Sequence, residues 1–270
     1  MCLIVFAWQV IPHVPLMAAA NRDEFYARAA APAAHWPSHP KVYAGRDLQA
    51  GGSWMGITQG GTTPGGTTPG GTAPGGTAPG GIAPGGVSGS RFAAITNIRG
   101  PQERRTDAPS RGALVADYLA GNMSAEQYVA LIEPDCAAYN GFNLVLGDCT
   151  TLIWFSNRGQ NDPRNGVPLA PGIYGLSNAL LDAPWPKVLN AKAQFASLLC
   201  QCAPDDAYFD MLTDTATVPD FRLPDTGVPL ELERSLSPIC IEMPEYGTRT
   251  STVVKLYAEA PATLHEVLIR

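Results

Sequence analysis

Residues 2–8 read Cys2-Leu3-Ile4-Val5-Phe6-Ala7-Trp8, an apolar run at the start of the chain. β-Branched and aromatic residues favour strands, and a short continuous apolar run is typical of a strand that is buried on both faces. The run therefore predicts a buried strand, and the other predicted elements are placed outward from it.

Cys2 directly follows the initiator methionine. Removal of Met1, which a small second residue favours, would leave a thiol and a free α-amino group on one residue. An α-amino group titrates at about pH 8 and can accept the proton of an adjacent nucleophile. This combination indicates an N-terminal-nucleophile amide hydrolase. The alternative is that Cys2 is a small hydrophobic side chain in a buried strand.

The composition indicates one large domain that spans residues 1–270, with 45% hydrophobic and 16% charged residues. A net charge of −6 without a Lys/Arg run disfavours nucleic acid and anionic membranes as partners. The six cysteines are spread out, no secretory leader is recognisable, and no apolar stretch reaches transmembrane length. We therefore expect reduced thiols, a cytoplasmic location and no stable membrane insertion.

A low-complexity repeat occupies residues 60–86, where five pentapeptides read Gly-Gly-Thr-Thr-Pro or a close variant. Glycine and proline at this density cannot form a packed core, so we expect a surface loop inserted at about residues 60–90. The flanking segments 53–58 and 91–97 both resemble strands. Without the repeat they would form a hairpin, and we interpret the repeat as a tolerated insertion at its tip.

Strands cluster towards both ends of the chain, and helices are predicted between them. Further strands are predicted at residues 2–8, 16–21, 143–147, 151–156, 172–177, 237–243, 250–258 and 263–269. Helices are predicted at residues 110–120, 124–132, 186–200 and 205–212, the first two with an N-terminal serine suited to capping. This order favours an α+β fold with layers of antiparallel sheet and helix over alternating βαβ units.

Polar residues at the ends of apolar strands are candidates for a catalytic site. Asp23, within Asn21-Arg22-Asp23-Glu24, could hold the α-amine of Cys2, although a salt-bridged turn is an equal alternative. Asn97 and Asn178 end apolar segments and could donate to an oxyanion, whereas asparagine there is more often a turn former. Arg249 could bind a carboxylate or stabilise the thiolate, and the ordinary alternative is a solvated arginine.

Signals for metal or haem binding are weak. His35 and His39 have helical spacing, but Pro37 between them prevents the helix. Cys200 and Cys202 match no zinc-binding pattern. We therefore predict no metal site.

Seven motifs follow one another in an order that resembles the NRDE family, the bacterial relatives of the transport and Golgi organisation protein. They are Met1-Cys2-Leu3-Ile4, Asn21-Arg22-Asp23-Glu24-Phe25, Gly51-Gly52-Ser53-Trp54-Met55-Gly56, Thr96-Asn97-Ile98-Arg99, Leu176-Ser177-Asn178, Pro184-Trp185-Pro186-Lys187-Val188 and Gly247-Thr248-Arg249-Thr250-Ser251-Thr252. The match spans nearly the whole chain, apart from the repeat.

The resemblance implies a four-layer αββα sandwich similar to N-terminal-nucleophile hydrolases that begin at cysteine. It implies that Cys2 is the nucleophile, Asp23 the residue that holds the α-amine, and Arg249 the arginine that supports the thiolate. It further implies that Asn97 and Asn178 lie on the oxyanion side. Those hydrolases carry an arginine three positions before the aspartate, whereas Ala20 stands there and the arginine is Arg22. Because strands alternate faces, Arg22 is expected to point away from the side of Asp23.

The function predicted from these observations is hydrolysis of a carbon–nitrogen bond in a small, linear, non-peptide amide, without a cofactor. The alternative is a non-catalytic protein that uses the same cleft to carry haem or an acyl-coenzyme A, as the resemblance also suggests. A structural domain with a vestigial site is a third reading. We expect a small-molecule amide or acyl compound as the partner in the first case.

Overall fold

Two antiparallel sheets form the centre of the computed structural model, which describes residues 2–59, 89–100 and 105–270. The first, sheet A, has the strand order β11-β10-β2-β1-β9. Its strands are β1 (Cys2–Ile11), β2 (Val14–Phe25), β9 (Gly172–Leu176), β10 (Tyr246–Leu256) and β11 (Thr263–Leu268). The N-terminal apolar run therefore lies inside the sheet, with β2 on one side and β9 on the other.

The second sheet, sheet B, has the strand order β3-β4-β5-β6-β7-β8, so consecutive strands are neighbours. Its strands are β3 (Ala30–Trp36), β4 (His39–Asp47), β5 (Met55–Thr58), β6 (Arg91–Asn97), β7 (Phe142–Asp148) and β8 (Leu152–Ser156). Neighbouring strands are antiparallel throughout, and the long connection between β6 and β7 carries α1 and α2.

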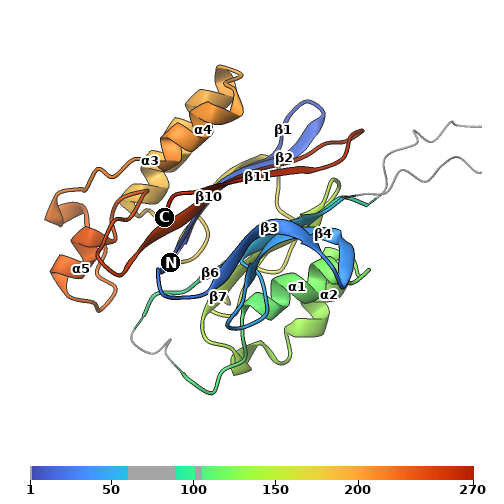
Figure 1. The fold of residues 1–270 in the computed structure, drawn as a ribbon, viewed down its shortest axis with the longest axis horizontal. Coiled ribbons are helices and arrows are strands. Elements are labelled where there is room, and N and C mark those ends of the chain that lie inside the picture. The colour runs from blue at the N-terminus through green and yellow to red at the C-terminus, as the bar shows by residue number, and fades with distance from the viewer. Residues whose placement is uncertain (1, 60–88, 101–104) are drawn as a thin grey trace, which may run out of the picture.

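Helices cover the outer face of each sheet (Figure 1). The helices on sheet B are α1 (Gly112–Ala120) and α2 (Ala125–Ile132), and those on sheet A are α3 (Pro186–Cys200) and α4 (Asp205–Leu212). The remaining helical segments are η1 (Cys136–Ala138), η2 (Asp220–Arg222) and α5 (Leu230–Ser235). None of the helices in the described residues is long and apolar enough to span a bilayer.

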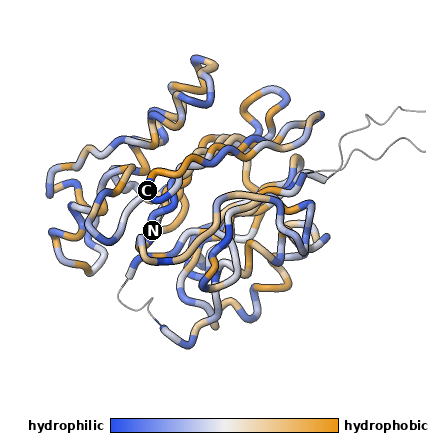
Figure 2. The backbone as a smooth tube through the Cα atoms, in the orientation of Figure 1, coloured by the Kyte–Doolittle hydropathy of each residue, from blue (hydrophilic) through white to orange (hydrophobic). Residues whose placement is uncertain are grey.

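Strand β1 shows how alternate side chains divide between two layers. Ile4, Phe6 and Trp8 pack between the sheets, whereas Leu3 and Val5 pack against the helices on sheet A. Both faces of the strand are buried, which is why its sequence is apolar throughout. Figure 2 shows hydrophobic residues recurring along the strands of both sheets. The layers are compatible with the predicted sandwich.

Most of the predicted elements are confirmed, among them β6, α3 and α4 with the predicted bounds. Ser124 caps α2, because its side chain accepts a hydrogen bond from the Gln127 backbone in a capping box. The predicted cap at Ser110 is wrong. Arg111 occupies the cap position of α1 and makes no side-chain capping bond.

Two further differences concern the sheets. Residues 237–243 form no strand and contribute only an isolated bridge at Glu242. Their apolar side chains Ile239 and Ile241 are nevertheless buried, so hydrophobicity there reflects packing rather than pairing. Strands β3 and β4 were not predicted from sequence. They are rich in alanine, proline and histidine, so their sequences lack the alternation of apolar and polar residues that predicts a strand. In addition, β3 is irregularly paired with β4.

The hairpin around the repeat is confirmed, because β5 and β6 pair in antiparallel fashion from Met55 opposite Ala94 to Thr58 opposite Arg91. The predicted surface loop itself lies outside the described residues. All six cysteines fall within the described residues, and each is a free thiol.

Candidate active site

Cys2 is the first residue of β1 and lies directly opposite Arg22 of β2. Residues that are directly opposite in an antiparallel pair project from the same face of the sheet. For Cys2 and Arg22 this is the inter-sheet face, because Ile4 and Ala20, the next residues of the same parity, belong to the core between the sheets. The thiol and the guanidinium group therefore lie side by side.

Arg22 is held in place by an aromatic ring. Its guanidinium carbon lies 4.2 Å from the centre of the Trp54 ring, and the side chain is only 6% exposed. The carboxylate of Glu24 is 4.0 Å away, at the limit of an ion pair. Stacking on tryptophan stabilises a partly desolvated arginine. A single orientation beside Cys2 is thus favoured.

A cavity of about 430 Å³ opens at this end of the two sheets. Cys2 and Asn97 line it, together with Ser53 and Trp54, which directly precede β5, and Gly112, the first residue of α1. The charged residues in its lining are Arg22, Asp23, Glu24, Arg28, Asp47 and Arg111. The cavity is therefore suited to a small polar molecule.

Asp23 also lines the cavity, and its carboxylate is buried with 2% of the residue exposed. The Thr248 hydroxyl, on the paired strand β10, donates to Asp23 Oδ1 at 2.7 Å. Burial raises the pKa of the carboxyl group above its ordinary value, and the charge of Lys187 is the first of the influences that oppose this rise. Asp23 is thus a buried carboxylate that depends on nearby positive charge.

The two predicted asparagines occupy different positions. Asn97 ends β6 and lines the cavity. Asn178 is fully buried, and its side-chain amide donates to the backbone carbonyl oxygen of Asn97 at 2.8 Å. Asn178 is not among the residues that line the cavity and instead fixes the backbone that carries Asn97. Their predicted oxyanion roles stay predictions.

Arg249 is not among the residues that line the cavity. It occurs at an irregularity in the pairing of β10 with β2, and its guanidinium group donates to the backbone carbonyl oxygen of Arg28. Arg28 lines the cavity, but Arg249 does not. Of the arginines considered from the sequence, the one beside Cys2 is therefore Arg22. As strand alternation predicts, Arg22 and Asp23 point to opposite faces of the sheet. The face of Arg22 is also the face of Cys2.

The electrostatic surroundings of Cys2 act in both directions. Burial raises the pKa of its thiol above the ordinary value, and the charge of Asp23 raises it further. The positive charge of the N-terminus lowers it most, followed by Arg22 and a hydrogen bond from the backbone of Asp23. Because the thiolate is the reactive form, Arg22 is the side chain that most directly supports it.

The segment that follows β9 connects the two sheets at the site. The Ser177 hydroxyl donates to the Cys2 carbonyl oxygen at 2.9 Å, and the Arg99 backbone N–H donates to the Asn178 carbonyl oxygen at 2.7 Å. These bonds join β1 of sheet A to the end of β6 in sheet B. The start of β1, which carries Cys2, is thereby held by β2 on one side and by the segment after β9 on the other.

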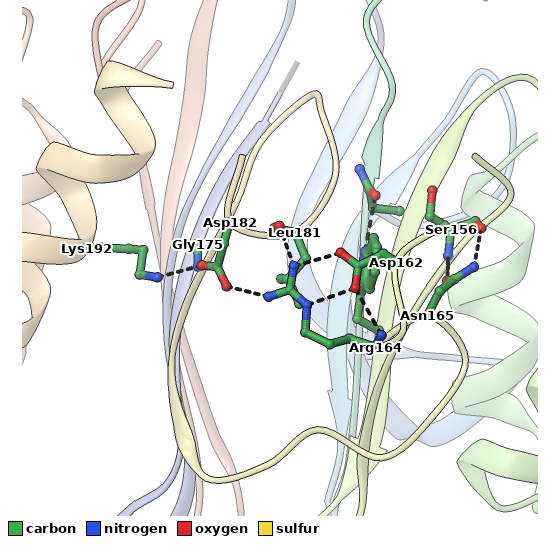
Figure 3. Close-up of polar contacts among 10 residues, drawn as sticks. Ser156, Asp162, Arg164, Asn165, Gly175, Leu181, Asp182 and Lys192 are labelled. Carbon is green, nitrogen blue, oxygen red and sulfur yellow. Dashed lines mark hydrogen bonds and ion pairs between the residues drawn. The ribbon is translucent and has the colours of Figure 1, made fainter. Parts of the chain in front are cut away.

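A polar network around Asp182 and Arg164 holds the segment that follows β9 (Figure 3). Asp182 accepts hydrogen bonds from Arg164 at 2.8 Å and from Lys192 of α3 at 2.5 Å, and its other contact is the Gly175 backbone N–H. Arg164 also pairs with Asp162 at 2.8 Å. The network therefore ties the connection after β8 to β9 and α3.

Lys187, Trp54 and Arg22 are the site residues to which sequence reasoning assigned no catalytic role. Lys187 and Trp54 occur in motifs that carried the family resemblance, and a lysine in the first turn of an otherwise apolar helix start is a detectable signal. Within its own strand, Arg22 only alternates with Asp23. Its cross-strand register with Cys2 decides its place, and no local pattern reports that register.

No group of three or more His, Cys, Asp or Glu side chains in the described residues could hold a metal ion. The two histidines with helical spacing make other contacts: His35 contacts the Pro40 carbonyl oxygen, and His39 contacts the Ser38 hydroxyl.

The fold and the site define an α+β protein in which a cysteine at the start of a central strand faces a polar cavity. The family profile described as Transport and Golgi organisation 2 matches residues 1–64 and 81–269. The chain therefore belongs to this family, as the NRDE resemblance predicted. The unmatched interval falls within the repeat, in agreement with an insertion.

Curated relatives agree with this assignment. The chain is 33% identical to the Transport and Golgi organization protein 2 homolog of Bos taurus, and the alignment covers 98% of this chain and 92% of the relative. The homolog of Homo sapiens is 30% identical with the same coverage. Transport and Golgi organization protein 2 of Drosophila melanogaster is 30% identical over 74% of this chain and 65% of the relative.

Proposed function

We propose that the protein is an N-terminal-nucleophile amide hydrolase in which Cys2, after removal of Met1, attacks a small non-peptide amide. The observation that carries the proposal is the position of Cys2, at the edge of a polar cavity and directly opposite Arg22. The succession of helix, sheet, sheet and helix also supports an N-terminal-nucleophile hydrolase fold. Residues 1–270 would form one domain around this site.

The proposed reaction proceeds through an acyl-enzyme. The α-amino group of Cys2 accepts the thiol proton, Sγ bonds to the amide carbonyl carbon, and the carbon–nitrogen bond breaks as the leaving amine takes that proton. Water then cleaves the thioester, which releases a carboxylic acid and restores the thiol. One amide and one water thus give one amine and one acid.

Four residues at or behind the cavity have a task in this scheme. Arg22 favours the thiolate, and Asp23 holds the α-amino group. The Asn97 side-chain amide is the donor assigned to the oxyanion that forms when sulfur adds to the carbonyl group. Asn178 acts one hydrogen bond behind it, because it fixes the Asn97 backbone.

The test combines the intact mass of the purified protein with hydrolysis of a panel of short N-acyl amines. We expect a mass that lacks Met1, and release of free amine that Cys2→Ala abolishes. Cys2→Ser should retain only a small residual rate, because an alcohol ionises far less readily than a thiol. Cys149→Ala is the matched control, since Cys149 is another partly buried free thiol outside the cavity lining. Retention of Met1, or full activity of Cys2→Ala, would refute the proposal.

A carrier of haem or acyl-coenzyme A is the competing proposal. Among the described residues of the cavity lining none is a histidine, and the ring of Trp54 is already stacked by Arg22. This lining offers little apolar surface for a porphyrin, so the residues do not fit haem well. Titration with haemin should therefore give no saturable Soret shift. A shift that persists in Cys2→Ala would favour the carrier.

The proposed place of action follows from the chemistry of Cys2. A nucleophilic thiol must stay reduced, and reducing conditions prevail in the cytoplasm. We therefore propose a cytoplasmic enzyme. The names of the relatives refer to transport and Golgi organisation and name no reaction.

A further inference from the structure

A second, much smaller cavity adjoins the polar cavity at Cys2, and the proposed reaction does not yet use it. Cys2, Arg22, Trp54 and Ile95 line both cavities, so the two meet at the residue that carries the thiol. The volume of the smaller cavity is about 10 Å³. A space of this size holds about one water-sized group, such as a methyl group.

The wall on the side of sheet A comes from strands β1, β2 and β10. Ile4 lies directly opposite Ala20, which in turn lies directly opposite Thr252. These three lining residues therefore project from one face of the sheet. It is the inter-sheet face that Cys2 and Arg22 share, because Ile4 and Ala20 belong to the core between the sheets. The smaller cavity thus extends from Cys2 into the space between the sheets.

The opposite wall comes from sheet B. Met55 is the first residue of β5 and is 3% exposed, and Ile95 of β6 is 6% exposed. The Ile95 backbone N–H donates to the Trp54 carbonyl oxygen at 2.8 Å, so these lining segments are hydrogen-bonded to each other. With Ile4 and Ala20 on the other side, most of the lining is apolar. The large cavity, in contrast, is lined by six charged residues.

Asn21, which also lines the smaller cavity, restricts the movement of β2. Its side-chain amide donates to the backbone carbonyl oxygens of Leu212 at 2.8 Å and Ile239 at 2.9 Å. Its Oδ1 accepts a hydrogen bond from the Ser251 hydroxyl at 2.6 Å. A displacement of β2 would break these buried bonds, and an oversized group in a packed core is destabilising. The cavity therefore limits the size of the group that it can accept.

The chemistry of the wall also selects the kind of group. A buried water molecule typically makes about three hydrogen bonds, which a mainly apolar wall does not favour. An apolar group needs no such partners and gains free energy when it leaves water for this wall. A small apolar group attached to Cys2 is therefore the occupant that matches both the size and the lining.

We propose that the smaller cavity is the acyl subsite of the enzyme and selects a short, unbranched acyl group of the size of acetyl, while the amine part of the substrate occupies the large polar cavity. This assignment rests on the proposed function, because it requires an acyl group on Cys2. In the acyl-enzyme the acyl carbon is bonded to Sγ, and its methyl group contacts Ile4, Ala20 and Met55. The substrates are then short-chain N-acyl derivatives of polar amines.

The first test compares amides of ethanolamine that differ only in the acyl group: acetyl, propionyl, butyryl and hexanoyl. One methylene group in a close-fitting pocket changes kcat/KM by about 10–200-fold. We therefore expect the highest kcat/KM with acetyl and a decrease of about tenfold or more from acetyl to butyryl. Met55→Ala enlarges the cavity and should shift the preference towards butyryl. Equal kcat/KM values across the series, or an unchanged preference in folded Met55→Ala, would overturn the proposal.

Met17→Ala is the matched control for Met55→Ala. Met17 is a buried methionine of β2 that packs on the other face of sheet A, against the helices, and is not part of the cavity lining. It should therefore leave the order of the acyl groups unchanged. A shift towards butyryl as large as that in Met55→Ala would overturn the proposal, because it would not originate from the cavity.

A second test needs no substrate and uses alkyl methanethiosulfonates, with which a thiolate forms an alkyl disulfide and releases methanesulfinate. We expect the methyl reagent to label Cys2 at least about tenfold faster than the butyl reagent, relative to the exposed Cys200 of the same protein. Ala20→Val, which fills the cavity, should slow methyl labelling of Cys2 by about tenfold. Ala18→Val is the control, because Ala18 lies on the same face outside the lining. Labelling of Cys2 that is independent of alkyl length would overturn the proposal.

The two tests distinguish failure of the subsite from failure of the proposed function. Size-selective labelling of Cys2 in a protein that cleaves no amide would support the selective cavity and refute the hydrolase. Amide cleavage that does not depend on the length of the acyl group would support the hydrolase and refute the acyl subsite.

Discussion

Gly45 lies directly against the indole ring of Trp54. A Cβ atom at Gly45 would be 2.1 Å from the nearest ring carbon, which no side chain can tolerate. The ring could only move away, and the guanidinium group of Arg22 rests on that ring. A glycine of β4 therefore determines where the arginine beside Cys2 can lie.

Gly45→Ala is expected to lower the free energy of unfolding by about 1–3 kcal/mol, because the added methyl group overfills a packed site. It should also slow alkylation of Cys2, since Arg22 loses its support. Urea denaturation and iodoacetamide labelling followed by mass spectrometry measure the two effects. Gly172→Ala is the control, because its Cβ would approach the Tyr174 ring only to 3.3 Å. Equal labelling rates in Gly45→Ala and wild type would contradict the link from Gly45 to Cys2.

Arg22→Met is expected to raise the pKa of the Cys2 thiol, because a nearby positive charge that favours the thiolate is removed. A rise of about one pH unit would reduce the alkylation rate at about pH 7 roughly tenfold. The pH dependence of iodoacetamide labelling provides the measurement.

Arg46→Met is the matched control for this prediction. Arg46 also stacks on a tryptophan, with 4.9 Å to the Trp36 ring, but it is not part of the cavity lining. Labelling of Cys2 should be unaffected. Arg249→Met completes the comparison: if it slows labelling while Arg22→Met does not, the thiolate is supported by the arginine that the family resemblance indicated.

Lys187 should also leave a signature in the pH dependence of stability. Its pKa is lowered from 10.5 to about 8 in the folded protein, so between these values the unfolded chain binds more protons than the folded one. The contribution of Lys187 to the free energy of unfolding therefore increases by about 3 kcal/mol as the pH rises through this window. The same contribution is lost as the pH falls back to about 8. Urea midpoints of wild type and Lys187→Met, measured in parallel, should diverge in favour of wild type as the pH rises. A constant difference would mean that Lys187 titrates normally.

Deletion of residues 61–86 should leave the fold intact. The hairpin partners Thr58 and Arg91 are joined independently of the repeat, because the Thr58 hydroxyl donates to the Gly89 carbonyl oxygen and accepts from the Arg91 backbone N–H. Closing a shorter loop changes the entropy only slightly. The melting temperature should stay within a few degrees of wild type by circular dichroism. A large decrease would show that the repeat contributes to packing.

Local patterns were sufficient for the strands and helices that carry their own signal. β1 and α3 have unbroken apolar or periodic sequences between clear boundaries, and their positions could be predicted. β3 and β4 could not be, because their burial alternates irregularly and their stability comes from pairing within sheet B. The segment at 237–243 shows the opposite case, because its buried apolar residues produce a strand-like sequence although no strand forms.

The candidate site divides in the same way. Cys2, Asp23 and Asn97 could be proposed as neighbours from strand ends and family resemblance, and all three line the cavity. Arg22 and Lys187 could not, because their relevance depends on strand register and on where a helix packs against a sheet. These are long-range properties that a single sequence does not display.

The place of β1 between β2 and β9 has a consequence for biosynthesis. β1 is synthesised before its partner β9, which begins only at Gly172, and before β10, which pairs with β2 and ends at Leu256. The start of the chain must therefore remain outside the finished sheet until most of translation is complete. In the proposed function, this interval is when an aminopeptidase would remove the methionine ahead of Cys2.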